Sequence, residues 1–329
     1  MDMQEKPMRY RWVSQTLGLI TPLSAIIGLY IGGWFMGITI VYLLGFSMIL
    51  DLLLGVDNSD NPNQEGIMHD LIIHAHALLV PILTLYLVYT IGTSEWTNLN
   101  WLGIASVGLS NGASGIITAH ELGHRKPKSF SWYMARVDLL CVLYLHFTTE
   151  HNYTHHKHWA REVDPTSSKF GQSIYGHFIR TVPKQIKGAY ETKSGNTIRQ
   201  LLLEITLIAV IFLYSLPAGL AFISQALVAV FLLEFVNYLQ HHGLARDQRQ
   251  RAGPEHAWES RHRWSRWTLL ELPLHPSHHL KASTHYERLE THDDSPQLPF
   301  GYYVMFWISL IPPLFEKVMR KSHERFLSQ

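Results

Sequence analysis

The chain has one cysteine, Cys141, among 329 residues. A single thiol excludes a disulfide framework, a cysteine-type zinc site and an iron–sulfur cluster ligated by this chain alone. Charged residues are also scarce, at 16% of the sequence, compared with about 25% in a typical soluble domain. The formal net charge is only +1, so the charge balance indicates no nucleic-acid partner. No GxGxxG fingerprint marks a dinucleotide-binding unit.

The chain is instead rich in long apolar runs. Six of them lie at roughly 13–32, 35–55, 70–92, 99–119, 200–217 and 219–238. A bilayer span needs about 20 predominantly apolar residues, so each run is predicted to be a transmembrane helix. Two shorter runs, at about 136–147 and 302–315, are predicted to lie on or in the interface. The expected fold is an all-α integral membrane protein, with residues 1–329 forming one domain.

The positive charges predict how the protein is oriented. Six spans place both termini and the polar segments 120–199 and 239–329 on one side of the membrane. That side carries Lys6, Arg9 and Arg11, about a dozen Lys and Arg in the first segment, and an Arg-rich stretch at 246–266. By the positive-inside rule this side is cytoplasmic. We therefore expect a multi-pass protein of the inner (cytoplasmic) membrane with a cytoplasmic cap.

Histidine is unusually abundant, with 21 residues, and four clusters fall in the cap. In "HELGH", His120 and His124 are four residues apart and so share one helix face. In "EHNYTHHKH", an α-helix would place His151 and His155 about 40° apart and His156 about 100° further round. One helical turn could therefore serve two adjacent metals. The remaining clusters are "NYLQHHG", with His241 and His242, and "HPSHH", with His275, His278 and His279.

The clusters together indicate more than one metal ion. A single zinc site takes three or four ligands, so eight or nine histidines over-supply it. Imidazole binds iron, zinc, copper and nickel, and ligand type alone does not choose among them. By itself, "HELGH" fits a zinc metalloprotease in which Glu121 is the general base. Histidines outside the clusters are predicted to be structural or solvated: His69, His177, His262, His292 and His323. His74 and His76 lie inside a span, where an ionisable side chain suggests function, but they belong to no cluster.

The ordered motifs HExxH, EHxxxHH, NYxxHxG and HxxHH resemble those of the membrane alkane monooxygenase family. They also resemble the xylene-type monooxygenases and, more distantly, the membrane fatty-acid desaturases. The stretch "DPTSSKFGQSIYGHFIRTVP" from Asp164 is similar to the family's sequence after the second motif. The resemblance implies a non-haem diiron centre held entirely by histidine. The implied ligands are His120, His124, His151, His155, His156, His241, His275, His278 and His279.

The resemblance further implies hydroxylation of a methyl group of a lipophilic hydrocarbon, a terminal alkane or an alkylbenzene methyl. The reaction would use O2 and two electrons from a separate rubredoxin or ferredoxin-type reductase, expected to dock near Arg125, Lys126 and Lys128. A desaturase with the same irons and the zinc protease remain alternatives. Trp34, Phe35 and Phe46 are expected to line the substrate channel.

Some positions depart from the usual family motifs. Gln240 and His242 replace Glu and Tyr around the third-motif histidine, and Ser277 replaces an acid in the fourth motif. His158 also falls outside the pattern. Metal-bound histidines normally donate their other N–H to a carboxylate or carbonyl. The carboxylates available for this role are Glu121, Glu150, Asp164, Glu234 and Glu271. Glu121 is expected to orient an imidazole or to receive a positive partner from the cap.

Overall fold

The computed structural model describes residues 11–60 and 66–328 of the chain. Lys6 and Arg9, which contribute to the predicted orientation, lie outside these residues. Throughout the described ranges the regular structure is helical, and the only β-type pairings there are two isolated β-bridges. This confirms the all-α prediction.

Six stretches of the described chain are long and apolar enough to cross a membrane. The first comprises α1 (Arg11–Gln15), η1 (Thr16–Leu19) and α2 (Ile20–Ile31), and the second comprises η2 (Gly33–Gly37), α3 (Ile38–Ile40), η3 (Val41–Phe46) and α4 (Ser47–Leu53). The third is α5 (Ile67–Thr93), and the fourth comprises α6 (Asn100–Ser110), η4 (Asn111–Ile116) and α7 (Ile117–Gly123). The last two are α11 (Ile174–Tyr214) and α12 (Leu216–Gln240). Each overlaps one of the six predicted runs.

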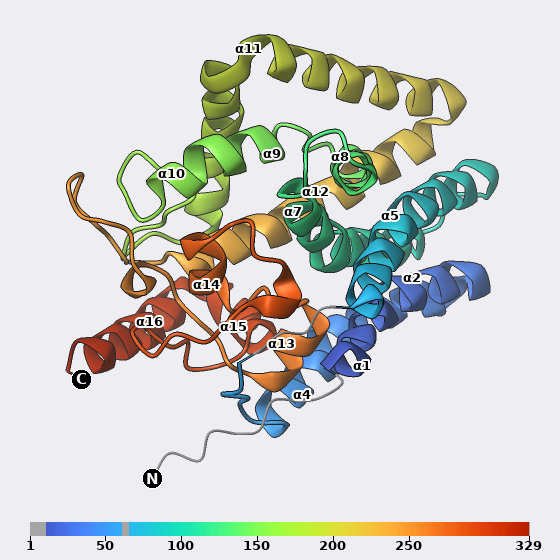
Figure 1. The fold of residues 1–329 in the computed structure, drawn as a ribbon. Helices are drawn as coiled ribbons and strands as arrows, with labels where there is room; N and C mark the ends of the chain where they lie inside the picture. Colours follow the sequence, from blue (N-terminus) through green and yellow to red (C-terminus); the bar gives the residue numbers. More distant parts are fainter. Residues whose placement is uncertain (1–10, 61–65, 329) are drawn as a thin grey trace.

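The fifth stretch differs most from its prediction, because α11 is 41 residues long and begins in the polar segment. It bends at Lys193, whose φ of −147° and ψ of 69° interrupt the helical backbone. Figure 1 shows that α11 changes direction at this bend. Its first part points in a different direction from its second part, which runs beside α12. Hydropathy detects only the apolar second part, so the polar first part was predicted as cap without a defined helix.

Small and polar residues bring the fourth span close to α12. A Cβ atom added at Gly112 would lie 2.8 Å from Leu232 Cδ1, and one at Gly108 only 2.7 Å from the Gln225 carbonyl oxygen. Between them, the Asn111 side-chain amide donates hydrogen bonds of 2.9 Å to both Thr84 and Gln225. Close backbone approach and interhelical hydrogen bonds are the interactions that hold helices together in lipid, where apolar burial gives no advantage.

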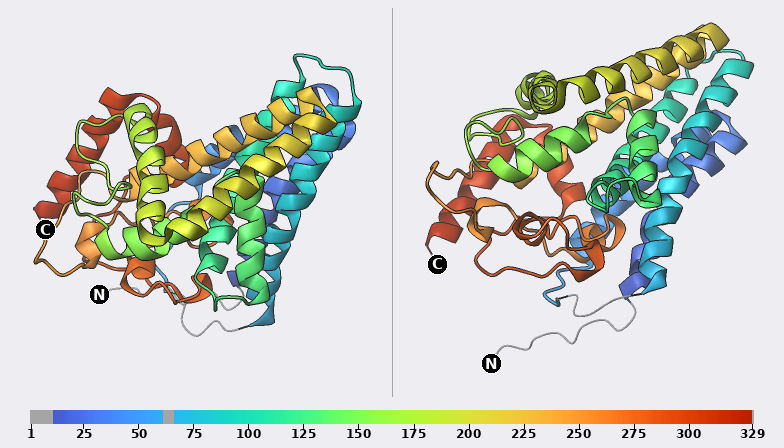
Figure 2. Two further views of the ribbon diagram at one scale, coloured as in Figure 1. Left: turned by 90° about the horizontal axis from the view of Figure 1, so that it is seen from above. Right: turned by 45° about the horizontal axis from the view of Figure 1, so that its top comes forward.

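The cap gathers at one end of the helix bundle, and both ends of the described chain lie there (Figures 1 and 2). Its short helices are α9 (Phe147–Glu150), η5 (His151–His155), α10 (His156–His158), η6 (Pro254–His256), α13 (Arg263–Thr268), α14 (His275–Leu280), η7 (Tyr286–Arg288), α15 (Tyr302–Ser309) and α16 (Pro312–Leu327). The separate helix α8 (Phe130–Cys141) packs against α5 and α7. It contains much of the short apolar run predicted at 136–147.

Buried ion pairs fix the cap to the first span. The Arg11 guanidinium lies 3.0 Å from both Asp57 and Glu271, and Arg266 lies 2.6 Å from Glu271. All four side chains are nearly inaccessible to solvent. Glu271, which was a candidate partner for a metal-bound histidine, is therefore committed to arginine. Because it precedes "HPSHH" by only a few residues, this network also fixes where the fourth histidine cluster lies.

Candidate metal centre

The four histidine clusters converge at the cap end of the bundle. His120 lies in α7 and His124 directly follows it, where the fourth span ends. His151, His155 and His156 belong to η5 and α10, His241 follows α12, and α14 supplies the last three. All nine predicted ligands thus come from the ends of two spans and from three short cap helices.

The nine side chains form two sets, within each of which the ligand atoms all lie within 4.8 Å of one another. The first set is His120, His124, His151, His156 and His278, and the second is His155, His241, His275 and His279. His158 and His242 belong to neither set. The two sets lie next to each other. The His156 ring of the first set neighbours the His155 ring of the second, and the His278 ring of the first neighbours the His279 ring of the second.

A π-helix decides which histidine joins which set. Residues 151–155 form a π-helix, in which hydrogen bonds join residues five apart rather than four. His151 and His156 consequently face each other, with their Nε2 atoms 2.9 Å apart, while His155 points into the second set. The α-helical geometry that would place His151 and His155 about 40° apart does not hold here. This turn contributes histidines to both sets, as expected, and its service to two metals stays a prediction.

The ring nitrogens are spaced so that several of them could bind one metal cation. Within the second set, Nε2 of His275 lies 3.1 Å from that of His241 and 2.8 Å from that of His279. Imidazole nitrogens bound about 2.0–2.1 Å from a common ion would lie about 3 Å apart at adjacent octahedral positions. Burial, followed by repulsion from neighbouring imidazolium charge, lowers the pKa of His241 to about 3 and holds the pKa of His275, His278 and His279 well below the usual value. These rings are therefore neutral at pH 7, the form that binds metal.

One carboxylate supports the second set directly. Asp164 Oδ2 lies 3.0 Å from His155 Nδ1, and Thr166 and Ser167 donate hydrogen bonds to the same carboxylate. Burial opposes ionisation of Asp164, but the contacts with His155 and Ser167 outweigh it and lower its pKa. An ionised Asp164 therefore fixes the His155 ring so that its Nε2 faces the other ligands.

The departures from the family motifs have visible structural counterparts. Ser277, where an acid is usual, accepts a hydrogen bond from the Glu290 backbone. Correspondingly, Nδ1 of His275 and of His279 find no hydrogen-bond partner among the described residues. The Gln240 amide donates to the Tyr302 hydroxyl at 3.1 Å. His242 bridges Ser168 and Glu316, which links the third motif to the C-terminal helix α16.

The remaining candidate carboxylates lie elsewhere. Glu121 is buried, lies 3.6 Å from Arg125 and accepts a hydrogen bond from the Tyr286 backbone N–H. This is the positive partner predicted for it, and it points to a role in holding the cap. Glu234 accepts hydrogen bonds from Tyr144 and Gln185. Glu150 is fully buried, and neither of its carboxylate oxygens has a hydrogen-bond partner within the described chain.

The isolated histidines have ordinary partners, as predicted. His69 bonds Gln15, His74 bonds Ser131, His76 bonds Ser114 and His262 bonds Ser260. His177 lies 3.6 Å from Glu234, and the His323 ring packs beside Phe170. His146 was not singled out in the sequence, because it stands alone. It is almost completely buried, and neither ring nitrogen bonds a described residue.

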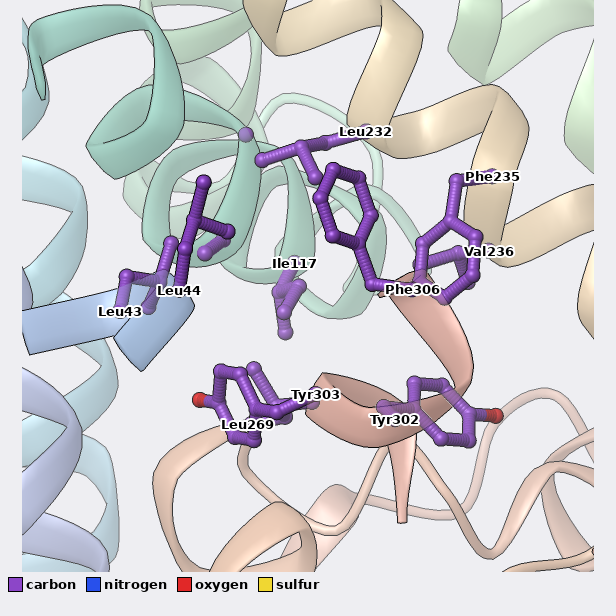
Figure 3. A pocket seen from close by; sticks show the side chains of 12 residues that line it. Leu43, Leu44, Ile117, Leu232, Phe235, Val236, Leu269, Tyr302, Tyr303 and Phe306 are labelled. Carbon is purple, nitrogen blue, oxygen red and sulfur yellow. The ribbon is translucent and has the colours of Figure 1, made fainter. Parts of the chain in front are cut away.

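An apolar path leads from the bundle to the histidines. A narrow cavity of about 50 Å³ is lined by Leu43, Leu44, Gly112, Ala113, Ile117, Leu232, Phe235, Val236, Leu269, Tyr302, Tyr303 and Phe306. Figure 3 shows Ile117 projecting into this space and the hydroxyls of Tyr302 and Tyr303 pointing away from it. Those hydroxyls bond Gln240 and Thr268, so the cavity wall is hydrocarbon.

A second cavity of about 30 Å³ shares Gly112, Ile117 and Val236 with the first. Its lining also includes His120 and His151 of the first set and His275 of the second. The two cavities are therefore consecutive parts of one path that ends between the metal sets. The aromatic residues expected to line it do not: Trp34 and Phe35 line a separate apolar cavity with Leu102, and Phe46 is more than half exposed on the second span. Hydropathy cannot tell which face of a span points inward, which is why that prediction is wrong.

Comparison with known proteins agrees with this geometry. The family described as fatty acid desaturase matches residues 96–309. The chain is 30% identical to alkane 1-monooxygenase of Ectopseudomonas oleovorans, over 94% of this chain and 84% of that protein. It is 33% identical to alkane 1-monooxygenase 1 of Pseudomonas aeruginosa, over 85% of this chain and 81% of that protein.

The chain belongs to the membrane alkane monooxygenase family. It is therefore an oxygen-dependent monooxygenase. A weaker similarity, 27% identity over 68% of this chain and 64% of the other, links it to the hydroxylase component of xylene/toluene monooxygenase from Pseudomonas putida. The zinc-protease alternative loses its basis, because "HELGH" lies within this family match and Glu121 pairs with Arg125.

Proposed function

We propose that the protein hydroxylates the terminal methyl group of a linear alkane at a centre of two iron ions, using O2 and two electrons. The observation that carries the proposal is the hydrocarbon-lined path that ends between two sets of histidines. Linear chains suit this path because both of its cavities are narrow, and two of the relatives are named for alkane oxidation.

The all-imidazole donor sets fit iron, and iron, when bound, supplies the activation of dioxygen that no side chain can provide. The chain's own residues perform the remaining tasks. Ile117, Val236 and Leu233 hold the end of the hydrocarbon beside His120, His151 and His275 and exclude water from it. Asp164 orients His155. A narrow path admits the end of a chain before its middle, which directs the reaction to the terminal carbon.

The electrons are proposed to come from a separate rubredoxin or ferredoxin-type protein that docks at the cap, with the cap in the cytoplasm. The lone Cys141 supports an external donor, because it leaves the chain without cysteines to hold a redox cluster. Lys126 and Lys128 are exposed beside the end of α7 and remain candidates for this docking. Arg125 is mostly buried and already paired with Asp70 and Glu121, so it contributes less to an external surface than expected.

Metal analysis and product identification test the proposal together. Purified protein expressed with iron available should contain about two irons per chain and little zinc. With an electron donor and labelled O2, it should convert a linear alkane to the 1-alcohol, with the oxygen atom derived from O2. An alkene product would support the desaturase alternative instead. One zinc and no iron would contradict the diiron centre.

A further inference from the structure

A third cavity opens on the flank of the molecule, apart from the hydrocarbon path. It has a volume of about 530 Å³, and its lining includes His124 and His156 at the metal centre. One wall comes from α8 through Trp132 and Arg136, and the opposite wall comes from α11 through Lys193, Asn196 and Arg199. α11 bends at Lys193 (Figure 1), and the cavity lies between α8 and the stretch of α11 that begins at this bend.

The lining of this cavity is strongly cationic. It contains Arg125, Arg136, Lys193 and Arg199, and no Asp or Glu is among the described residues that line it. Arg125 is neutralised by Asp70 and Glu121. The other three cations pair with no carboxylate anywhere in the described chain. The Arg136 guanidinium instead lies 3.0 Å from the centre of the Trp132 ring, and the Lys193 ammonium 3.6 Å from that of Tyr153. Three unneutralised charges around a concave space attract an anion.

The cavity lies where the lipid-facing surface begins. On α8, Phe130, Tyr133 and Val137 are exposed. On the second part of α11, beyond the bend, the exposed apolar side chains begin at Ile198 and continue with Leu202, Leu203 and Ile205. Tryptophan, tyrosine and basic residues next to such a surface are typical of the headgroup level of a bilayer.

We propose that this cavity binds the phosphate headgroup of an anionic phospholipid. Arg136 and Arg199 would contact the phosphate from the two walls, and the acyl chains would lie along the exposed apolar faces of α8 and α11. The headgroup would then cover the polar opening above His124 and His156. An acidic protein is the weaker candidate, because these cations line a concavity flanked by exposed apolar side chains. The inference requires a membrane-embedded protein but does not depend on the hydroxylation reaction.

The test measures lipid binding to the intact, delipidated protein in detergent by native mass spectrometry. Phosphatidylglycerol and phosphatidylcholine with identical acyl chains are titrated onto wild type, the Arg136→Gln/Arg199→Gln double variant and an Arg249→Gln/Arg251→Gln control. The control removes the same amount of charge from an exposed loop that is distant in sequence from both walls of the cavity. One cation near an anionic lipid contributes about fivefold. The cavity variant should therefore bind phosphatidylglycerol about 25-fold more weakly, whereas the control should match wild type and phosphatidylcholine binding should not change.

Three results would overturn the proposal. The first is equal phosphatidylglycerol binding by the two double variants. The second is displacement of the lipid by millimolar inorganic phosphate alone, because a free anion would then suffice. The third is unchanged lipid binding with a raised KM for a protein electron donor in the cavity variant, which would assign the cavity to that donor. If the double variant does not fold, Lys193→Gln alters only an exposed side chain and should weaken lipid binding about fivefold.

Discussion

At the scale of single residues, Asp164 offers a direct test of how the ligands are held. Its carboxylate contacts His155 Nδ1 at 3.0 Å and is itself held by Thr166 and Ser167. Asp164→Asn keeps the shape but removes the charge that fixes the ring. We expect iron affinity or turnover to fall about 10–100-fold, the usual effect of removing a partner behind a metal ligand. Iron content per chain and turnover with an alkane measure it.

Glu162→Gln is the matched control, because Glu162 is two residues away and largely exposed, paired only with Lys169. It should behave like wild type. Full iron content together with full activity in Asp164→Asn would show that the His155 ring needs no carboxylate behind it.

Glu121 tests a different role. Because it pairs with Arg125 and the Tyr286 backbone, Glu121→Gln should leave both irons in place and lower hydroxylation without abolishing it. The expected loss is within about tenfold, since the contact with the metal site is indirect. Isotope-traced conversion of an alkane to its alcohol measures the loss. Complete loss of iron would place Glu121 at the metal and contradict this assignment.

The sequence predicted nine histidine ligands, which the structure brings together, but it did not predict how they divide into two sets. Spacing alone indicated the four clusters and two metals, and the resemblance to the family selected the nine histidines among them. The division depends on the π-helix at 151–155, which depends on packing that spacing does not reveal. Of the five candidate carboxylates, only Asp164 contacts a ligand histidine directly, and choosing it required the tertiary structure.

At the scale of elements, the second span should limit the length of the substrate. Leu44 lines the cavity farther from the histidines, whereas Leu52, on the same span, is 53% exposed. Leu44→Trp would fill the far end of the path, so activity on long alkanes should fall about tenfold or more relative to short ones. Leu52→Trp adds the same bulk on the outside and should leave the preference unchanged. Product yields across a series of n-alkanes measure both, and an identical shift in both variants would contradict the proposed path.

The spans illustrate which element properties a sequence reveals. All six were predicted because a run of about 20 consecutive apolar residues is typical of a transmembrane helix. The first part of α11 was not predicted as a helix, because its polar residues carry no hydropathy signal. The sequence also did not predict which face of each span points into the helix bundle. A span is apolar on the side facing lipid as well as on the side facing its neighbours. The residues that line the path could therefore be identified only from the packed structure.

At the scale of the whole molecule, iron retention should depend on pH. The pKa of His241 is lowered to about 3 and that of His124 to about 4, chiefly by burial. An unfolded chain takes up protons at its histidines from about pH 6.5 downward, whereas the folded chain does not until far lower pH. Acid therefore favours the unfolded, metal-free state throughout that window, by about 1.4 kcal/mol per pH unit for each such histidine.

We accordingly expect constant iron content above pH 7 and progressive loss below about pH 6.5, with the midpoint displaced downward because bound metal competes with protons. Equilibration with a chelator from pH 8 to pH 4, followed by iron analysis, measures the profile. Retention that stays flat down to pH 4 would contradict ligation by histidine alone.

The order of the ligands along the chain has a consequence for biogenesis. His275, His278 and His279 follow the sixth span, and each metal set needs at least one of them. A nascent chain leaves the ribosome from its N-terminus, so all six spans have been synthesised before either set can be complete. A chain that stops at the end of α12 would lack His278 from the first set and His241, His275 and His279 from the second. Neither set can therefore be completed until the chain has been synthesised beyond its sixth span.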